Sequence, residues 1–597
     1  MTDPLQLIQA AAVAAIQDLY GQQVAPDSLT IQETKKEFEG DFTLVTFPLA
    51  RLKVGSPPQI GEALGKAMVA RIPELTGYNV IKGFLNLRFS DQFWLHWLAT
   101  ARTQADYFRS QQGEGQTVVV EYCSPNTNKP LHLGHLRNII LGYAVVEILR
   151  ANGYTVIPTC LFNDRGTNIS KSMYAYLQSD TRDTPESAGI KGDKLVGDYY
   201  VAYAQMHHEA VSKLTDEQGL DKKAAEQQAP TTQAINDLTI RWEDGDQEVV
   251  ELWKRMNSWV YAAYDDTFHR LGVHFDRFYY ESEVYQRGKG AVQEGLEMGV
   301  FYRDADGAVK VDLTPDGLDE KVLLRANGTS LYITQDLAIA ADKFQEFGMD
   351  KSIYVVGNEQ DYHFKVLFTI LKKLGKPYAE GLFHLSYGMV DLPSGKMKSR
   401  EGTTVEADDL MDEMIERAAA GTEELGKTDD MSPPELQELH RVIGLGGLKF
   451  FLAKVDPKKR MLFDPQESID LHGQTATFIQ YAYTRTAALQ RKGQEIPAFS
   501  AEISPEDALT TDERALILRI FRYKDVLREA AASYNPSLLA NYAYELARDF
   551  NRFYNGDKIL QQEKPHTSAF RFALSQLAGE AMQQSLRLLG IEVPSRM

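Results

Sequence analysis

Apolar residues recur every three or four positions over residues 136–150, which predicts a helix with one buried face. The β-branched run TVVVEYC at 117–123 precedes this helix and predicts a buried parallel strand, and a second apolar run follows at 154–162. A strand, a helix and a strand in this order predict a right-handed βαβ unit in a parallel sheet.

Further strands are predicted at 352–357 and 383–392, and a long, polar, helical stretch at about 170–270 indicates an insertion into the sheet domain. Before this domain, an opening helix, a helix at 58–72 and a strand at 83–90 indicate a small α+β unit. After it, Ala- and Leu-rich helical segments indicate a bundle, at 478–492, 511–534, 536–556 and 567–589.

These patterns predict an α/β fold with three parts. The central part is a Rossmann-like parallel-sheet domain with a helical insertion, preceded by an N-terminal α+β domain and followed by a C-terminal all-α helix bundle. The predicted domain boundaries are 1–112, 113–465 and 466–597.

The composition is that of an ordinary folded protein, because 43% of the 597 residues are hydrophobic and 25% are charged. It excludes a disordered chain, a collagen-like repeat and a small disulfide scaffold. No apolar stretch reaches the 18 residues of a membrane span, and the N-terminal segment is typical of a helix rather than a signal peptide. The only two cysteines, Cys123 and Cys160, favour a reducing, cytoplasmic location and two buried thiols.

The net charge of −19 argues against a general nucleic-acid binder. The charge is unevenly distributed, however, since residues 478–597 hold 15 basic and 14 acidic side chains. A polyanionic partner would therefore be met locally, by a basic stripe on an acidic body.

The segment His132-Leu133-Gly134-His135 lies between the first predicted strand and the helix that follows it. The N-terminus of a helix presents free N–H groups that suit phosphate, and Gly134 allows a nucleotide to approach the backbone closely. Two imidazoles one turn apart can donate hydrogen bonds to phosphate oxygens. A pair of capping or packing histidines explains the tetrapeptide equally well by itself, but its position in a βαβ unit favours phosphate binding.

A second segment, KMKSR at 396–400, follows His132 by 264 residues. Glycines and cationic residues of this kind usually form a solvated loop without a function. Combined with HLGH in this order, the segment instead predicts a second cationic clamp for a triphosphate.

Together, these segments resemble the class I aminoacyl-tRNA synthetases, and among them the arginyl-tRNA synthetases. HLGH matches the first family signature, HIGH, and KMKSR matches the second, KMSKS. The resemblance covers the whole chain, and its more specific blocks are SPNTNKPLHLGHLRN, LYITQDLA (331–338), YVVGNEQDYHF (354–364), PKKRMLF (457–463) and FIQYAYTR (478–485).

The resemblance implies ATP-dependent ligation of L-arginine to tRNA(Arg) through an arginyl-adenylate, with release of AMP and pyrophosphate. His132, Gly134 and His135 would bind the ATP phosphates, with the two histidines acting in catalysis. Lys396 and Met397 would bind ATP from the second signature, and Lys396 would hold the departing pyrophosphate. Mg²⁺ would be carried by ATP, and no protein metal site is expected.

The second signature departs from KMSKS because Ser399 stands in place of the second lysine. In many arginyl enzymes, a lysine just before the HIGH segment is thought to substitute for it. Lys129 is so placed and would be catalytic, while Lys398 and Arg400 are alternative sources of the missing charge.

The family's arginine-binding residues correspond to Glu121, Ser124, Asn126, Glu281, Tyr332, Asp336 and Gln360. Tyr332 and Asp336 are four residues apart and would share a helix face, where they would meet the guanidinium together with Glu281. Glu283 is the alternative to Glu281. Asn126 and Gln360 would hold the α-amino and carboxylate end. By themselves, a surface helix face and a capped turn would explain these residues as well.

In the bundle, aromatic and basic residues would contact the tRNA anticodon, namely Phe478, Tyr481, Arg485, Tyr554 and Met597. Stacking of a base on such a residue is worth roughly 1–3 kcal/mol, although filling of the bundle core is an equally good explanation for any single aromatic. The N-terminal domain would contact the tRNA elbow, and a monomer is expected. His363, Trp94 and Trp97 are interpreted as packing residues.

Three alternatives are open from the sequence. A small nucleotidylyltransferase also uses HxGH, but it would not need the helical tail. A synthetase for another amino acid would share both signatures and differ in its pocket. A non-catalytic RNA-binding paralogue is disfavoured because His132, His135 and Lys396 are all present.

Overall fold

The computed structural model describes residues 3–597 apart from positions 36, 286, 330, 392–404, 426–430, 495–507 and 562. The chain divides into two compact units. The first comprises Met1–Phe108, Arg485–Tyr523 and Glu545–Met582, and the second comprises Arg109–Thr484, Lys524–Tyr544 and Gln583–Met597.

The second unit is built on a five-stranded parallel sheet with strand order β12-β11-β5-β6-β7. Its strands are β5 (Thr117–Glu121), β6 (Thr155–Phe162), β7 (Arg277–Tyr280), β11 (Lys351–Gly357) and β12 (Leu382–Tyr387). The predicted parallel sheet is therefore confirmed. The strand β7 was not predicted, because its four residues are too few to show a periodic pattern.

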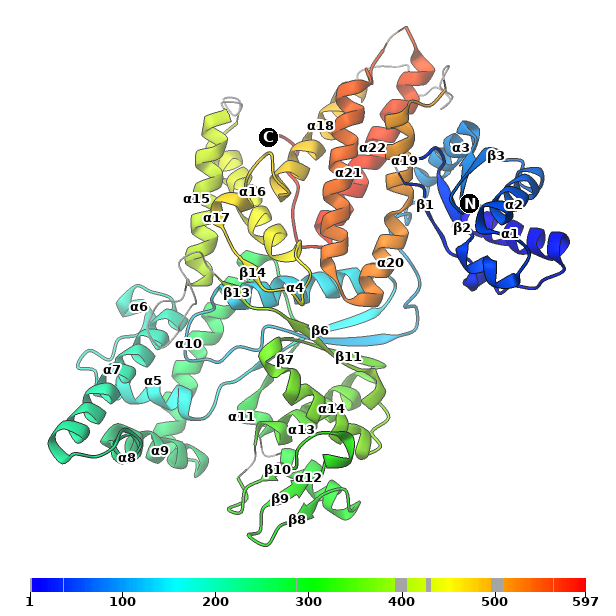
Figure 1. The fold of residues 1–597 in the computed structure, drawn as a ribbon. Coiled ribbons are helices and arrows are strands. Elements are labelled where there is room, and N and C mark those ends of the chain that lie inside the picture. Colours follow the sequence, from blue (N-terminus) through cyan, green and yellow to red (C-terminus); the bar gives the residue numbers. More distant parts are fainter. Residues whose placement is uncertain are drawn as a thin grey trace. The chain divides into compact units, whose positions relative to one another are not determined.

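Helix α4 (Leu133–Ala151) connects β5 to β6 and covers one face of this sheet, while α13 (Tyr332–Phe347) and α14 (Asp361–Lys373) cover the other (Figure 1). The apolar residues of α4 are almost all buried, as expected for a helix between two layers. Gly142 lies so close to β5 that a Cβ atom would come within 2.2 Å of the ring of Tyr122.

The region between β6 and β7 is a helical insertion, as predicted. Its helices are α5 (Thr167–Gln178), α6 (Pro185–Ala188), α7 (Gly192–Gln218), α8 (Lys222–Gln228), α9 (Pro230–Glu243) and α10 (Gln247–Leu271). Its buried residues lie in small clusters between these helices, for example around Tyr203 and Ile235.

Between β7 and α13 the chain forms α11 (Glu281–Val284), α12 (Gly288–Glu297) and a small antiparallel sheet of β8 (Tyr302–Arg303), β9 (Val309–Val311) and β10 (Lys321–Leu324). This sheet was not predicted, because its strands of two to four residues give no clear alternation. After β12, the described chain continues with β13 (Val390–Asp391), α15 (Ala407–Leu425), α16 (Pro433–Ala453), β14 (Met461–Leu462) and α17 (Pro465–Ser468).

The first unit contains the predicted N-terminal α+β part, an antiparallel sheet of order β1-β2-β4-β3. Its elements are α1 (Pro4–Tyr20), β1 (Ile31–Glu33), β2 (Phe42–Val45), α2 (Pro57–Arg71), β3 (Leu75–Ile81), β4 (Phe84–Phe89) and α3 (Asp91–Ala101). Trp94 and Trp97 are fully buried and pack against Phe521, so their interpretation as packing residues is confirmed.

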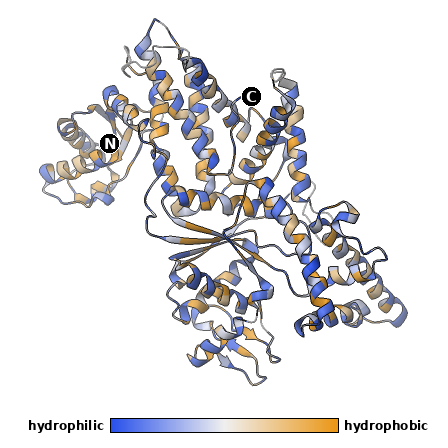
Figure 2. Ribbon diagram, turned by 180° about the vertical axis from the view of Figure 1, so that it is seen from behind, coloured by the Kyte–Doolittle hydropathy of each residue, from blue (hydrophilic) through white to orange (hydrophobic). Residues whose placement is uncertain are grey.

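The remaining C-terminal elements are helices, as predicted: α18 (Ala476–Gln494), α19 (Thr511–Phe521), α20 (Tyr523–Ser533), α21 (Pro536–Gly556) and α22 (Pro565–Arg587). The predicted segment 511–534 is two helices, with the break at Arg522. Apolar and polar residues alternate along these helices (Figure 2), which is typical of amphipathic packing. Among the described residues, no helix is both long and apolar enough to cross a membrane.

Candidate active site

Several candidate residues of the second unit follow the ends of parallel strands, at the carboxyl edge of the sheet. The HLGH segment follows β5, Glu281 follows β7, and Gln360 follows β11. In open parallel sheets this edge is where ligands bind, because the loops after the strands converge there. The sheet topology therefore brings together residues that are more than 200 positions apart in the sequence.

Two histidines open helix α4, and their rings lie against each other. The backbone N–H of Gly134 donates to Nδ1 of His132, and the backbone N–H of His132 donates to Nδ1 of His135, both at 3.1 Å. The ring centroids are 3.9 Å apart. A Cβ atom at position 134 would lie 3.0 Å from Cε1 of His132, so glycine leaves the space that this ring occupies.

These hydrogen bonds determine the tautomer of both rings. Because each Nδ1 accepts a hydrogen bond, the proton of each neutral imidazole lies on Nε2. Burial and the positive charge of Lys129 lower the pKa of His132 to about 4. Burial, His132 and Lys129 lower the pKa of His135 as well. At neutral pH both imidazoles are therefore uncharged, and each has an Nε2–H group that can donate to an anion.

The positive charge of Lys129 thus acts on both histidines, which follow it closely in the sequence. The predicted ATP-binding residues of the second signature, Lys396 and Met397, lie outside the described residues, as do Lys398 and Arg400.

The chain on both sides of positions 392–404 is attached to helix α4. After these positions, the backbone N–H of Leu133 donates to the carbonyl of Val405 (3.2 Å). Before them, the buried guanidinium of Arg137 donates to the carbonyl of Met389 (3.4 Å). The described residues on either side of these positions, Met389 and Val405, are therefore both bonded to residues at the N-terminal end of α4.

An acidic cluster is formed by Glu281, at the start of α11, and Asp336, in the second turn of α13. Glu281 is only 5% exposed. Burial raises its pKa to about 7; the positive charge of Arg165 opposes this shift, whereas the negative charges of Asp164 and Asp336 add to it. A cation stabilises the ionised form of a buried carboxylate that lies next to other carboxylates, and a guanidinium is such a cation.

Tyr332 lies one helical turn before Asp336 and next to the same cluster. Its side chain is largely exposed, and partial burial together with the negative charge of Glu281 raises its pKa. Glu283, the alternative to Glu281, is exposed. Glu281 is thus the more buried of the two candidate carboxylates.

Glu121 ends strand β5 and differs from the other two carboxylates because it already has a counter-charge. Its Oε2 lies 2.7 Å from Nζ of Lys343, whose side chain is completely buried. The same ammonium lies 4.3 Å from the ring centroid of Tyr354. Glu121 is thus paired with a buried ammonium, and it differs in this from Glu281, whose pKa is raised by burial.

The loop after β5 is conformationally strained. Cys123 and Ser124 have positive φ angles of 70° and 43°, which is uncommon for consecutive residues other than glycine. The side chain of Asn138 stabilises this backbone by accepting a hydrogen bond from the N–H of Cys123 (2.5 Å). Such strain is often found at functional sites. Both cysteines are buried and free, as predicted.

Asn126 and Gln360 lie in the loops after neighbouring strands. Asn126 forms an isolated parallel bridge with Asn163, which directly follows β6. Gln360 is exposed and immediately precedes α14. Both residues are therefore at the carboxyl edge of the sheet, together with Ser124.

Sequence analysis missed Asp164, a buried carboxylate beyond the end of β6. Its carboxylate accepts hydrogen bonds from the backbone and hydroxyl of Ser282 (2.8 and 2.7 Å) and from the hydroxyl of Tyr261 (2.9 Å). Burial raises its pKa despite these bonds. The signal was available, because a polar sequence directly after a buried parallel strand indicates the functional edge of a sheet.

The interpretation of His363 as a packing residue is wrong. Its Nε2 lies 2.6 Å from Oδ2 of Asp336, and both side chains are more than a quarter exposed. A single histidine in an otherwise apolar helical pattern gave no sign of this contact.

Two of the predicted tRNA-binding residues, Arg485 and Tyr554, lie side by side in the first unit. The guanidinium of Arg485 is 4.9 Å from the ring centroid of Tyr554 and donates to Oδ1 of Asn551 (2.7 Å). Both residues are partly exposed.

The other three, Phe478, Tyr481 and Met597, lie in the second unit and are also partly exposed. Phe478 packs against Tyr544, with ring centroids 5.3 Å apart. Met597 packs on a small apolar cluster of α15 and α16 that also contacts Met431.

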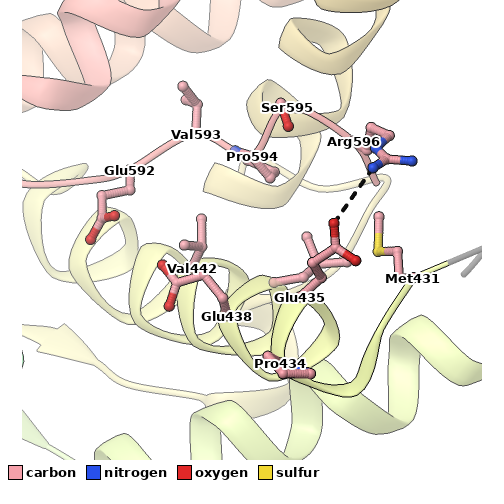
Figure 3. A pocket seen from close by; sticks show the side chains of 11 residues that line it. Met431, Pro434, Glu435, Glu438, Val442, Glu592, Val593, Pro594, Ser595 and Arg596 are labelled. Carbon is pink, nitrogen blue, oxygen red and sulfur yellow. Dashed lines mark ion pairs between the residues drawn. The ribbon is translucent and has the colours of Figure 1, made fainter.

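A pocket lies beside the C-terminal segment (Figure 3). Arg596 forms an ion pair with Glu435 across it (3.6 Å), and Glu438 and Glu592 also line it. Three carboxylates in its lining make this pocket unsuitable for phosphate. Among the described residues, no group of three or more His, Cys, Asp or Glu side chains could hold a metal ion.

The comparisons with known proteins agree with this geometry. Residues 98–461 match the family model for tRNA synthetases class I (R), catalytic domain, and residues 479–597 match the DALR anticodon binding domain. An arginine–tRNA ligase of Parabacteroides distasonis is 47% identical over 99% of both chains. One of Amoebophilus asiaticus is 48% identical over 99% of both chains.

A solved structure of arginyl-tRNA synthetase from Thermus thermophilus superposes with a TM-score of 0.77 at 25% identity and covers 100% of both chains. The family model alone spans more than half of this chain, and the relatives exceed 45% identity over nearly its full length. The chain therefore belongs to the class I arginyl-tRNA synthetase family.

Proposed function

We propose that this protein is an arginine–tRNA ligase. It joins L-arginine to tRNA(Arg) in an ATP-dependent reaction through an arginyl-adenylate. The acidic cluster is the observation that supports arginine as the substrate. Glu281 and Asp336 lie beside Tyr332, at the same sheet edge as the two neutral histidines.

In the first step, a carboxylate oxygen of arginine attacks the α-phosphorus of ATP, and the bond from this phosphorus to pyrophosphate breaks. The carboxylate is already a nucleophile and needs no base, so the protein contributes orientation and charge stabilisation. His132 and His135 donate from Nε2 to phosphate oxygens, close to the positive charge of Lys129. Lys396 and Met397 complete the ATP site from the second signature. Mg²⁺ would be carried by ATP rather than by protein side chains, and it would neutralise part of the phosphate charge.

In the second step, a ribose hydroxyl of the terminal adenosine of the tRNA attacks the activated carbonyl, and AMP leaves. The guanidinium of arginine is held by Asp336, Tyr332 and Glu281, and Ser124, Asn126 and Gln360 hold the α-amino and carboxylate end. Glu121 supports this pocket while paired with Lys343.

The parts of the chain have separate roles in this proposal. Residues 1–112 contact the tRNA elbow, 113–465 catalyse both steps, and 466–597 bind the anticodon through Phe478, Tyr481, Arg485, Tyr554 and Met597. The protein acts as a monomer in the cytoplasm.

ATP–pyrophosphate exchange with each of the twenty amino acids, with and without tRNA, tests the proposal. We expect exchange only with arginine and a strong dependence on tRNA. Exchange with another amino acid instead would show that the substrate is that amino acid and not arginine. Exchange with none, in the presence of tRNA(Arg) that binds, would support the non-catalytic RNA-binding alternative.

A further inference from the structure

His363 contacts the acidic cluster but has no role in the proposed reaction. Its imidazole lies 2.6 Å from Asp336, a distance typical of a strong, charge-assisted hydrogen bond. Among the described residues, no other side chain donates a hydrogen bond to Asp336. One oxygen of this carboxylate is therefore bound to His363, and the other is available to a ligand.

The position of His363 is well defined by the elements around it. It lies in the first turn of α14, three residues after Gln360, so the two side chains share a helix face. Its ring meets Phe364 edge to face, with centroids 5.6 Å apart. Phe364 in turn stacks on His384 of β12 at 4.3 Å.

The charged neighbours leave His363 as the direct partner of Asp336. Lys343, two turns further along α13, is already paired with Glu121. His384 is bonded elsewhere: its Nε2 donates to the carbonyl of Val356 (3.0 Å), and its Nδ1 lies near Asp361.

We propose that His363 is a positioning residue for arginine recognition. It donates Nε2–H to Oδ2 of Asp336, which fixes the plane of the carboxylate and directs Oδ1 toward the substrate guanidinium. A planar guanidinium needs a carboxylate in a defined orientation to form two parallel hydrogen bonds. The inference rests on the proposed function, because it assigns a partner to the carboxylate that would bind arginine.

Three variants test this role in steady-state aminoacylation with tRNA present. His363→Leu removes the donor and keeps an apolar side chain of similar size beside Phe364. We expect its KM for arginine to rise about tenfold, the loss of one charge-assisted hydrogen bond, with kcat and the KM for ATP within twofold of wild type.

His363→Gln provides an amide donor that reaches as far as Nε2, so we expect it to restore the KM for arginine to within threefold of wild type. His384→Gln is the matched control, because it removes the ring that stacks on Phe364 but leaves the hydrogen bond to Asp336 intact. We expect its KM for arginine to be unchanged.

An unchanged arginine KM in His363→Leu would overturn the proposal, and so would an equal rise in His384→Gln, which would indicate packing alone. A His363→Gln variant that fails as severely as His363→Leu would also overturn it. These results differ from failure of the proposed function, in which the wild-type protein itself would not charge tRNA with arginine.

Discussion

Glu281 is the residue whose protonation is expected to control arginine affinity. Burial raises its pKa to about 7, and a guanidinium would bind only to the ionised carboxylate. Above pH 7 the carboxylate is ionised before arginine binds. Below pH 7 arginine must displace a proton, so its apparent affinity falls by up to about tenfold per pH unit.

We therefore expect the dissociation constant of arginine, measured by titration calorimetry with tRNA present, to increase as the pH falls from 8 to 6. Glu281→Gln should bind arginine weakly at pH 8 and lose most of this pH dependence. Glu283→Gln is the control, since its exposed carboxylate lies only two residues away. If Glu281→Gln kept the full slope, another group would be responsible.

Asp336 is the second carboxylate of the cluster, and its removal should affect arginine selectively. Asp336→Asn keeps the shape of the side chain but removes the counter-charge of the guanidinium. We expect the KM for arginine to rise about 10²-fold, because unpairing a desolvated charge costs about 3 kcal/mol, and the KM for ATP to stay within threefold. A lower kcat with an unchanged arginine KM would show that Asp336 lies outside the pocket.

At this scale the sequence predicted which carboxylates lie near one another better than it predicted the partners that they contact. Glu281, Tyr332 and Asp336 were identified together and do lie in one cluster. The contacts of Glu121 with Lys343 and of Asp336 with His363 were missed. Such pairs join positions on different elements, and no periodic pattern along one element contains them.

Arg137 is the residue of helix α4 that bonds this helix to the segments before β13 and β14. This completely buried side chain donates to the carbonyls of Pro457 (3.2 Å), Lys459 (2.9 Å) and Met389 (3.4 Å). Burial lowers its pKa to about 10, so it stays charged at neutral pH. A cation that satisfies several buried carbonyls cannot be replaced by an apolar side chain without leaving them unpaired.

We expect Arg137→Met to lower the free energy of unfolding of the catalytic domain by about 3 kcal/mol or more. Urea denaturation measures this change. Arg150→Met, in the last turn of the same helix, is the matched control. Arg150 is 31% exposed in its pair with Glu147, so its loss should cost less than about 1 kcal/mol. Equal stabilities of the two variants would mean that the carbonyl contacts of Arg137 are not important.

The elements themselves were predicted best where the hydrophobic pattern is long. The strands β5 and β6, helix α4 and the C-terminal helices lie close to the expected ranges. The short strands β7 to β10 were not recognised, because elements of two to four residues are stabilised by their neighbours in space. The loop strain at Cys123 and Ser124 was equally invisible, since neither residue is a glycine.

For the whole molecule, the relevant property is the contrast between a net charge of −19 and a nearly neutral C-terminal region. A strongly acidic protein repels a polyanion at long range, so tRNA binding must depend on a few local contacts and on base stacking. Arg485 and Tyr554, which lie side by side, are the residues that we propose for these two kinds of contact.

We expect log K for tRNA(Arg) to fall with log salt concentration at a slope of roughly −2 to −5, as for a small number of phosphate contacts. Tyr554→Ala should weaken binding by about 1–3 kcal/mol without changing the slope, because stacking releases no counterions. Tyr554→Phe keeps the ring and should bind normally. Arg485→Gln should instead reduce the magnitude of the slope by about one. Filter binding from 50 to 300 mM salt distinguishes these effects, and binding independent of salt would contradict local charge recognition on an acidic body.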